Sequence, residues 1–144
     1  MAAASDVDLW TRMGDHSVGL ILPQRLVEYR VHAASASTRR FYEQMAVTEL
    51  IAANATCRRT GRPELTPQEW AELMRAQPLA QRLRRARLWR SRYLYRVGGG
   101  LLADGRPSGA AYLVLAALLA PKMVVRRFKR QVGARRPPRT AVTR

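Results

Sequence analysis

The sequence predicts a mainly α-helical protein with one short two-stranded β element, which is an α+β fold class. Three observations lead to this prediction. Apolar residues after Ser37 recur with a period near 3.6, as on one face of an α-helix. The stretch Thr66-Pro-Gln-Glu has the form of a helix start, with a capping threonine followed at once by proline and then by glutamate. Two short apolar runs, 18–22 and 25–32, have the length and composition of strands.

The N-terminal part of the chain is expected to contain one helix and both strands. A helix over 3–14 is capped by Ser5 or Asp6, and the acidic residues of its first turn suit the positive end of the helix dipole. The strand over 18–22 ends at a proline, whose nitrogen cannot donate a hydrogen bond to a neighbouring strand. The strand over 25–32 delivers a histidine to a loop of small residues.

The remainder of the chain is predicted to be helical up to a basic tail. The expected helices cover residues 38–60, 67–77, 79–97, 110–120 and 122–130, and Gly98-Gly-Gly ends the third of them. The run over 110–120 is apolar but is shorter than the roughly 20 residues that span a bilayer. We therefore expect it to be buried or to lie at an interface. Residues 133–144 are expected to form a disordered tail.

Positive charge is concentrated in the second half of the chain. The formal net charge is +16. Residues 1–74 hold eight arginines and nine acidic residues, whereas residues 75–144 hold eighteen lysines and arginines and a single acid, Asp104. Unneutralised charge of one sign destabilises a compact chain through self-repulsion. The asymmetry therefore indicates a polyanionic partner, either an anionic membrane surface or nucleic acid.

The chain has one cysteine, Cys57, and so it has no internal disulfide. The position of Cys57 in a helical pattern favours a small buried hydrophobic residue over a nucleophile. A lone thiol is typical of a reducing compartment. We expect a cytoplasmic protein that associates peripherally with a membrane.

Two motifs lie near the N-terminus. The first is Ser5-Asp-Val-Asp-Leu-Trp-Thr-Arg-Met, and the second is Leu22-Pro-Gln-Arg-Leu-Val-Glu-Tyr-Arg-Val-His with serines at 35 and 37. Together, at this separation, they resemble the second half of the catalytic domain of family-2 glycosyltransferases of the GT-A type. The likeness continues with lower specificity through the arginine-rich and apolar helices, and it covers most of residues 3–131. It implies the C-terminal portion of a GT-A-like α/β fold.

The resemblance divides the chain into three parts. Residues 1–61 would be a remnant of the catalytic domain, residues 62–132 a basic helical C-terminal region, and residues 133–144 the disordered basic tail.

The resemblance also implies a reaction, in which a sugar passes from a nucleoside-diphosphate donor to an acceptor hydroxyl. By motif position, Asp6 is the general base that takes the hydroxyl proton. His32 would help to hold a divalent metal, Mn²⁺ or Mg²⁺, at the leaving diphosphate. The likeness places four further side chains near the substrates: Asp8, Trp10, Arg30 and Ser35. The residues alone leave two alternatives open, with Asp6 as an exposed helix-capping acid and His32 as a strand-end residue that makes one hydrogen bond.

Two features depart from the family pattern. Ser5 stands where the family has a glutamate, and the nucleotide-binding strands with their Asp-x-Asp metal motif are not among these residues. The stretch Asp6-Val-Asp8 matches the Asp-x-Asp pattern, but it belongs to the motif that contains the general base. We therefore expect a fragment, a truncated product or half of a split enzyme. Such a chain would be inactive alone and would expose an apolar seam to a partner chain.

A hypothesis of another class is a non-catalytic module that binds an anionic membrane surface. The apolar run over 110–120 is followed by a cationic amphipathic segment, a combination typical of an interfacial element. The cations assigned to the membrane surface are Lys122, Arg126, Arg127, Lys129 and Arg130. Nucleic-acid binding is a third hypothesis, based on Trp89, Tyr93 and Tyr95 among arginines. No nucleic-acid-binding motif accompanies these aromatics, which equally suit the core face of a helix.

Overall fold

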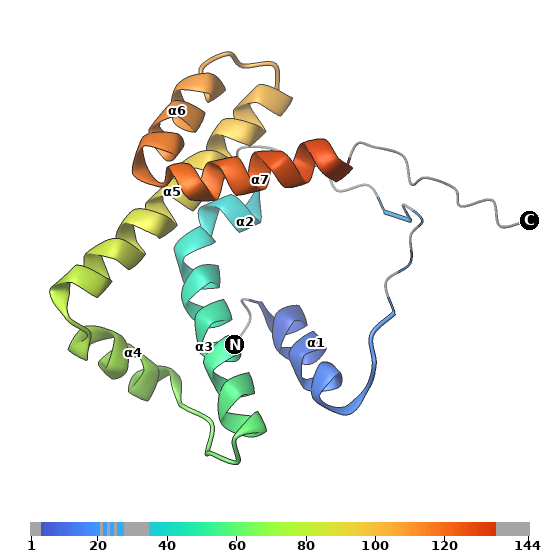
Figure 1. Ribbon diagram of the computed structural model, residues 1–144, viewed down its shortest axis with the longest axis vertical. Coiled ribbons are helices and arrows are strands. Elements are labelled where there is room, and N and C mark those ends of the chain that lie inside the picture. The colour runs from blue at the N-terminus through green and yellow to red at the C-terminus, as the bar shows by residue number, and fades with distance from the viewer. Residues whose placement is uncertain (1–3, 21, 23, 25, 28–34, 135–144) are drawn as a thin grey trace, which may run out of the picture.

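The computed structural model describes residues 4–20, 22, 24, 26–27 and 35–134, and α-helices account for most of them (Figure 1). The helices are α1 (Ser5–His16), α2 (Ala36–Arg39), α3 (Phe41–Arg59), α4 (Pro67–Ala76), α5 (Leu79–Ala103), α6 (Gly109–Leu119) and α7 (Pro121–Ala134). α3, α4 and α5 follow one another around an open frame, α1 lies beside α3, and the α5–α6 hairpin projects at one end with α7 across its base (Figure 1).

The predicted two-stranded β element is wrong, because no residue in the described part of the chain is in a strand. Val18 and Leu20 are 96% and 92% exposed, and Val27 is 84% exposed. A strand needs a neighbour that pairs its backbone and covers one face, and the described chain offers neither to these residues. The part that the structure describes is therefore all-α and does not have the α/β architecture of the GT-A fold. Residues 28–32, including Arg30 and His32, lie outside the described residues.

The helix start at Thr66 is confirmed, and the loop before it is fixed by a buried amide. The Thr66 hydroxyl accepts a hydrogen bond from the Glu69 N–H (3.2 Å), and the Glu69 carboxylate accepts one from the Thr66 N–H (2.7 Å). Gly61, with a φ of 67°, follows the end of α3 as predicted. The Asn54 side chain then accepts a hydrogen bond from the Leu65 N–H (2.8 Å) and donates one to the Leu65 carbonyl (3.1 Å). Because Asn54 is buried, these two bonds satisfy its amide and tie the loop to α3.

An aromatic cluster joins the start of α3 to the middle of α5. Phe41 is buried, and its ring lies 5.4 Å from that of Tyr42 and 5.7 Å from that of Tyr93. Tyr42 also stacks on Tyr93 at 5.5 Å and lies 6.4 Å from Trp89. Trp89 and Tyr93 therefore lie on the core face of α5. This packing accounts for the two aromatic residues without nucleic-acid binding. The Trp89 indole N–H donates to the Glu49 carboxylate of α3 at 2.8 Å.

The α5–α6 hairpin is the most closely packed part of the molecule, and its packing explains why α5 does not end at Gly98-Gly-Gly. A Cβ at Gly98 would lie 2.8 Å from the Gly109 carbonyl oxygen, and a Cβ at Gly109 would lie 2.5 Å from the Gly98 carbonyl oxygen. The two glycines thus let the helix backbones touch. The fully buried Ser91 hydroxyl donates to the Ala116 carbonyl at 2.7 Å. Packing of this kind offsets the cost of helical glycine, about 1 kcal/mol relative to alanine.

The C-terminal helices differ from the prediction in their limits, and α6 is largely exposed, which excludes the buried alternative and leaves the interface alternative open. α7 continues to Ala134, two residues into the predicted tail, and residues 135–144 lie outside the described part. α6 buries only Gly109 and Ala116. Its apolar residues Val114 and Leu118 are 59% and 75% exposed. No described helix is both long enough and apolar enough to cross a membrane.

Candidate functional site

The first motif forms α1, and its charged residues divide into two groups. Asp8 accepts a hydrogen bond from Arg12 one turn later (3.1 Å), and Arg12 also makes a two-pronged contact with Glu64 (2.8 and 2.9 Å). Asp6 is exposed in the first turn and takes no part in this network. The predicted capping by Ser5 or Asp6 is wrong, since Ala4 is the N-cap residue and no side chain caps the helix. Asp8 thus anchors the helix, while Asp6 is left facing solvent.

A second set of ion pairs fastens the end of α1 to α3. Arg58 contacts Asp15 at 2.8 Å and Glu64 at 3.1 Å, and Arg59 contacts Asp15 at 3.1 Å. The hydrogen bond from Arg58 holds the pKa of Asp15 below its usual value, and the hydrogen bonds from Arg12 and then Arg58 do the same for the pKa of Glu64. These carboxylates stay ionised near neutral pH, so they suit a structural role and not proton transfer.

The other substrate-binding candidates are not brought together with Asp6 by any hydrogen bond in the described chain. Trp10 is 67% exposed on α1. The Ser35 hydroxyl lies 2.9 Å from that of Thr38, and the Ser35 carbonyl accepts the Thr38 N–H at 2.9 Å, so Ser35 opens the short helix α2. Arg30 and His32 cannot be placed, since they fall outside the described residues.

The implied divalent metal can also be tested against the donor groups. Within the described ranges, no cluster of three or more histidine, cysteine, aspartate or glutamate side chains could hold a metal ion. Mn²⁺ and Mg²⁺ need several oxygen ligands, and the described residues do not provide them. No reaction step is therefore assigned to a metal held by this part of the chain.

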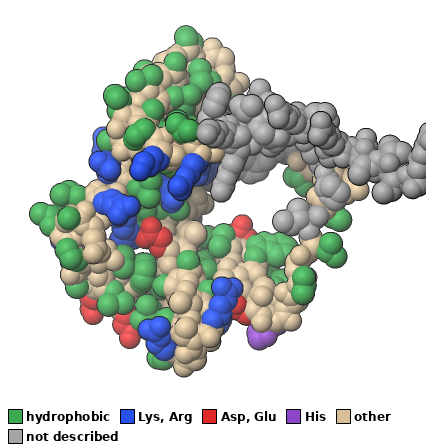
Figure 2. Space-filling view, in the orientation of Figure 1, with side chains coloured by type: hydrophobic (Ala, Val, Ile, Leu, Met, Phe, Trp, Pro, Cys, Tyr) green, Lys and Arg blue, Asp and Glu red, His purple; other side chains and the backbone are tan. Residues whose placement is uncertain are grey.

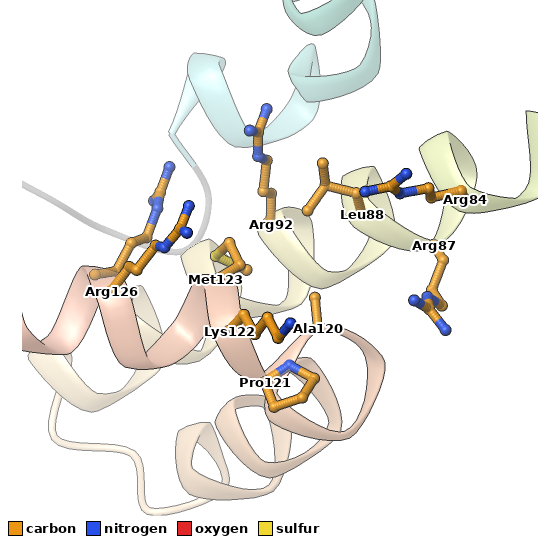
Figure 3. A pocket seen from close by; sticks show the side chains of 10 residues that line it. Arg84, Arg87, Leu88, Arg92, Ala120, Pro121, Lys122, Met123 and Arg126 are labelled. Carbon is orange, nitrogen blue, oxygen red and sulfur yellow. The ribbon is translucent and has the colours of Figure 1, made fainter. Parts of the chain in front are cut away.

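The most prominent charged feature is a cleft of about 900 Å³ between α5 and the start of α7 (Figure 3), which we call the cationic cleft. Its lining residues are Arg84, Arg87, Leu88 and Arg92 from α5, Ala120, and Pro121, Lys122, Met123, Arg126 and Arg127 from α7. Six of these ten residues are cations and none is an acid. Lysine and arginine side chains accordingly gather below the α6 end of the molecule in Figure 2.

The cationic cleft combines residues that the sequence singled out with residues that it did not. The sequence predicts Lys122, Arg126 and Arg127 at a charged surface, but it does not distinguish Arg84 and Arg87 from the other arginines of α5. Residues 84, 87 or 88, and 91 or 92 share one face of a helix, and this spacing is the only signal that could have grouped them. The side chains of Lys129 and Arg130 lie outside the described part, although both residues belong to α7.

The cations of the cleft differ from Arg85, which belongs to the same helix but pairs with a carboxylate. Arg85, on the neighbouring face of α5, contacts Glu49 at 2.7 Å and lies 4.3 Å from the centre of the Trp89 ring. Among the described residues, no carboxylate lies within ion-pair distance of the six cleft cations, although Arg127 lies 5.5 Å from the centre of the Tyr95 ring. Within the described part of the chain, the cleft is thus a concentration of positive charge without a paired carboxylate.

Comparisons with known proteins give no assignment, because no family model, no curated protein and no solved structure matches the chain.

Proposed function

We propose that this chain supplies the base-bearing part of a glycosyltransferase, and that it requires a separate nucleotide-binding part for activity. The pairing of the two N-terminal motifs carries the proposal. Asp6 would accept the proton of the acceptor hydroxyl as its oxygen attacks the anomeric carbon and the nucleoside diphosphate leaves. The arrangement of α1 supports this role, since Asp8 and Arg12 are engaged in holding the helix while Asp6 remains exposed.

The exposed apolar stripe of α1 supports the need for a second part. Leu9, Trp10 and Met13 are 56%, 67% and 47% exposed. They follow Asp6 at helical spacing, so that the carboxylate lies at the end of the stripe. A nucleotide-binding part that covered this stripe would bring a donor sugar next to Asp6. It would also have to provide the metal ligands that the described residues lack.

Two measurements test this proposal. Calorimetry with nucleoside-diphosphate sugars and Mn²⁺ should show no tight binding by the chain alone, since the described residues provide neither a donor site nor a metal site. Micromolar, metal-dependent binding would contradict the need for a separate part.

The second measurement uses a chimera that joins this chain to the nucleotide-binding half of a family-2 glycosyltransferase. In this chimera, Asp6→Asn should preserve donor binding and lower turnover by about 10² to 10⁴-fold, because the amide cannot accept a proton. Glu72→Gln removes another exposed carboxylate, on α4, and should leave turnover unchanged. Near-parental turnover of the Asp6→Asn chimera would remove Asp6 from the role of base.

We infer a second role, compatible with the first: peripheral binding to an anionic membrane surface on the cytoplasmic side. The observation that favours it is the position of the exposed apolar face of α6, which includes Val114, Leu115 and Leu118, directly before the cationic start of α7. Figure 2 has hydrophobic side chains over the α5–α6 hairpin and cations beneath them. An interfacial element uses the same two features, apolar burial and attraction to anionic lipid.

Vesicle co-sedimentation at low and high salt tests this role. Each lysine or arginine close to an anionic surface contributes about 1 kcal/mol and is screened by salt. Binding should therefore depend on anionic lipid and weaken as salt is raised. Equal binding to neutral and anionic vesicles would contradict the inference.

A further inference from the structure

The cationic cleft is formed by a sharp reversal between two helices. A single residue, Ala120, separates the end of α6 from Pro121, the first residue of α7. The Ala120 carbonyl accepts hydrogen bonds from the N–H groups of Met123 (3.0 Å) and Val124 (3.2 Å), which fixes the first turn of α7. This turn returns the chain to α5, so that the labelled side chains of Figure 3 enter from α5 on one side and from the start of α7 on the other.

The charges of the cleft favour the binding of an anion that carries more than one negative charge. Six cations line one cavity, and no described acid compensates them. The start of α7 adds the positive end of its dipole, since Pro121, Lys122 and Met123 all line the cleft. Arginine and lysine together suit a phosphate group, which arginine can grip through paired hydrogen bonds and lysine can approach as a point charge.

Arg92 adds a buried donor to the cleft lining, as Arg58, Trp70 and Arg85 do elsewhere in the described part of the chain. Its Nε is buried and has no hydrogen-bond partner in the described part of the chain. Its guanidinium donates one weak hydrogen bond to the sulfur of Met45 at 3.8 Å. A buried donor without a partner is energetically disfavoured, and such groups commonly mark a place where a water, an ion or a ligand completes the hydrogen bonding.

The surroundings of the cleft favour a lipid phosphate over a free phosphate ion as the ligand. Ala120, part of the cleft lining, follows directly on α6, and Leu118 at the end of α6 is 75% exposed. An exposed apolar surface thus begins at the edge of the cationic cleft and has no partner among the described residues. A phosphate held in the cleft could extend acyl chains along α6, whereas a free phosphate would leave this surface in water.

We propose that the cationic cleft is a headgroup site for a lipid phosphomonoester, with the phosphate between the arginines of α5 and Lys122, and the acyl chains along α6. A monoester is preferred over a diester because it carries a second negative charge and a third free oxygen, both of which the cleft can engage. The proposal rests on the membrane role inferred above and makes it specific for one headgroup chemistry.

The test compares two kinds of vesicle at the same zeta potential, one with phosphatidic acid and the other with phosphatidylglycerol, both in phosphatidylcholine. The full chain should bind the phosphatidic acid vesicles about tenfold more tightly, the gain expected from one additional charge-assisted hydrogen bond. Equal affinities would overturn the headgroup site and leave membrane binding intact. Failure to bind either vesicle would overturn both.

Matched variants separate the site from general electrostatics. Arg84→Gln with Arg87→Gln removes two cleft cations, whereas Arg82→Gln with Arg90→Gln removes two exposed cations of the same helix outside the cleft. The first pair should abolish the preference for phosphatidic acid. The control pair should weaken binding to both vesicles and keep the preference, and loss of the preference in both pairs would overturn the assignment.

A second comparison uses the two ends of the α6 region. Lys122→Gln should reduce the preference for phosphatidic acid, and Arg106→Gln, in the hairpin turn and outside the cleft, should retain it. Circular dichroism checks that each variant is folded. Titration with inorganic phosphate and glycerol 3-phosphate should show at least tenfold weaker binding than the vesicles. Equal affinity for a soluble phosphate, or tighter binding of an RNA duplex, would overturn the lipid assignment.

Discussion

Two adjacent glycines of α5 should respond in opposite directions to the same substitution. Gly98→Ala places a Cβ 2.8 Å from the Gly109 carbonyl oxygen and 3.0 Å from side-chain atoms of Tyr112 and Leu113. The carbonyl belongs to backbone, so the helices must move apart, and overpacking of this kind costs up to about 3 kcal/mol. Alanine's higher helix propensity returns about 1 kcal/mol, which leaves a net loss of about 2 kcal/mol. At Gly99 a Cβ would meet nothing within 4 Å, so Gly99→Ala should gain about 1 kcal/mol.

The assay is thermal unfolding followed by circular dichroism at constant pH and salt. For a chain of this size, 1 kcal/mol corresponds to about 3 °C in Tm. Gly98→Ala should therefore lower Tm by about 6 °C, and Gly99→Ala should raise it by about 3 °C. The two variants have the same composition and alter the same helix, so differences in the unfolded state cancel. Shifts of the same sign and similar size would refute the close crossing of α5 and α6.

The remaining predictions concern the polar contacts that hold the N-terminal half together. Asn54→Ala leaves the N–H and carbonyl of Leu65 without their buried partner and should lower the free energy of unfolding by about 2 kcal/mol; an unchanged denaturation midpoint would show that the loop does not depend on this amide. Stability should also fall with acidification. The folded-state pKa values of Asp15 and Glu64 are depressed, so their contribution is complete above the unfolded-state values near pH 4 and is lost as pH drops through the lower folded-state values. Glu64→Gln should flatten the plot of Tm against pH below about 4, and an unaltered slope would contradict the assignment.

Local sequence signals determined those parts of the fold that depend on a few neighbouring residues. The start of α4 at Thr66 follows from two hydrogen bonds within one turn, and the end of α3 before Gly61 follows from a left-handed φ of 67°. Lys122 and its neighbours were assigned to a charged surface for the same reason, since their segment is amphipathic by itself. The hypothesis of a glycosyltransferase likewise rests on motifs in the sequence, and it stays a prediction.

Tertiary structure decided the features that depend on what a segment meets in space. The runs over 18–22 and 25–32 have the composition of strands, but the described residues find no pairing partner and expose Val18 and Leu20. Gly98 has the local character of a helix terminator, yet α5 passes through it because Gly109 packs directly on its backbone. The composition of a segment and the period of its apolar residues indicate which secondary structure the segment prefers by itself. They do not report that the turn at Ala120 returns α7 to α5, and only that return places the arginines of α5 opposite Lys122 in one cleft.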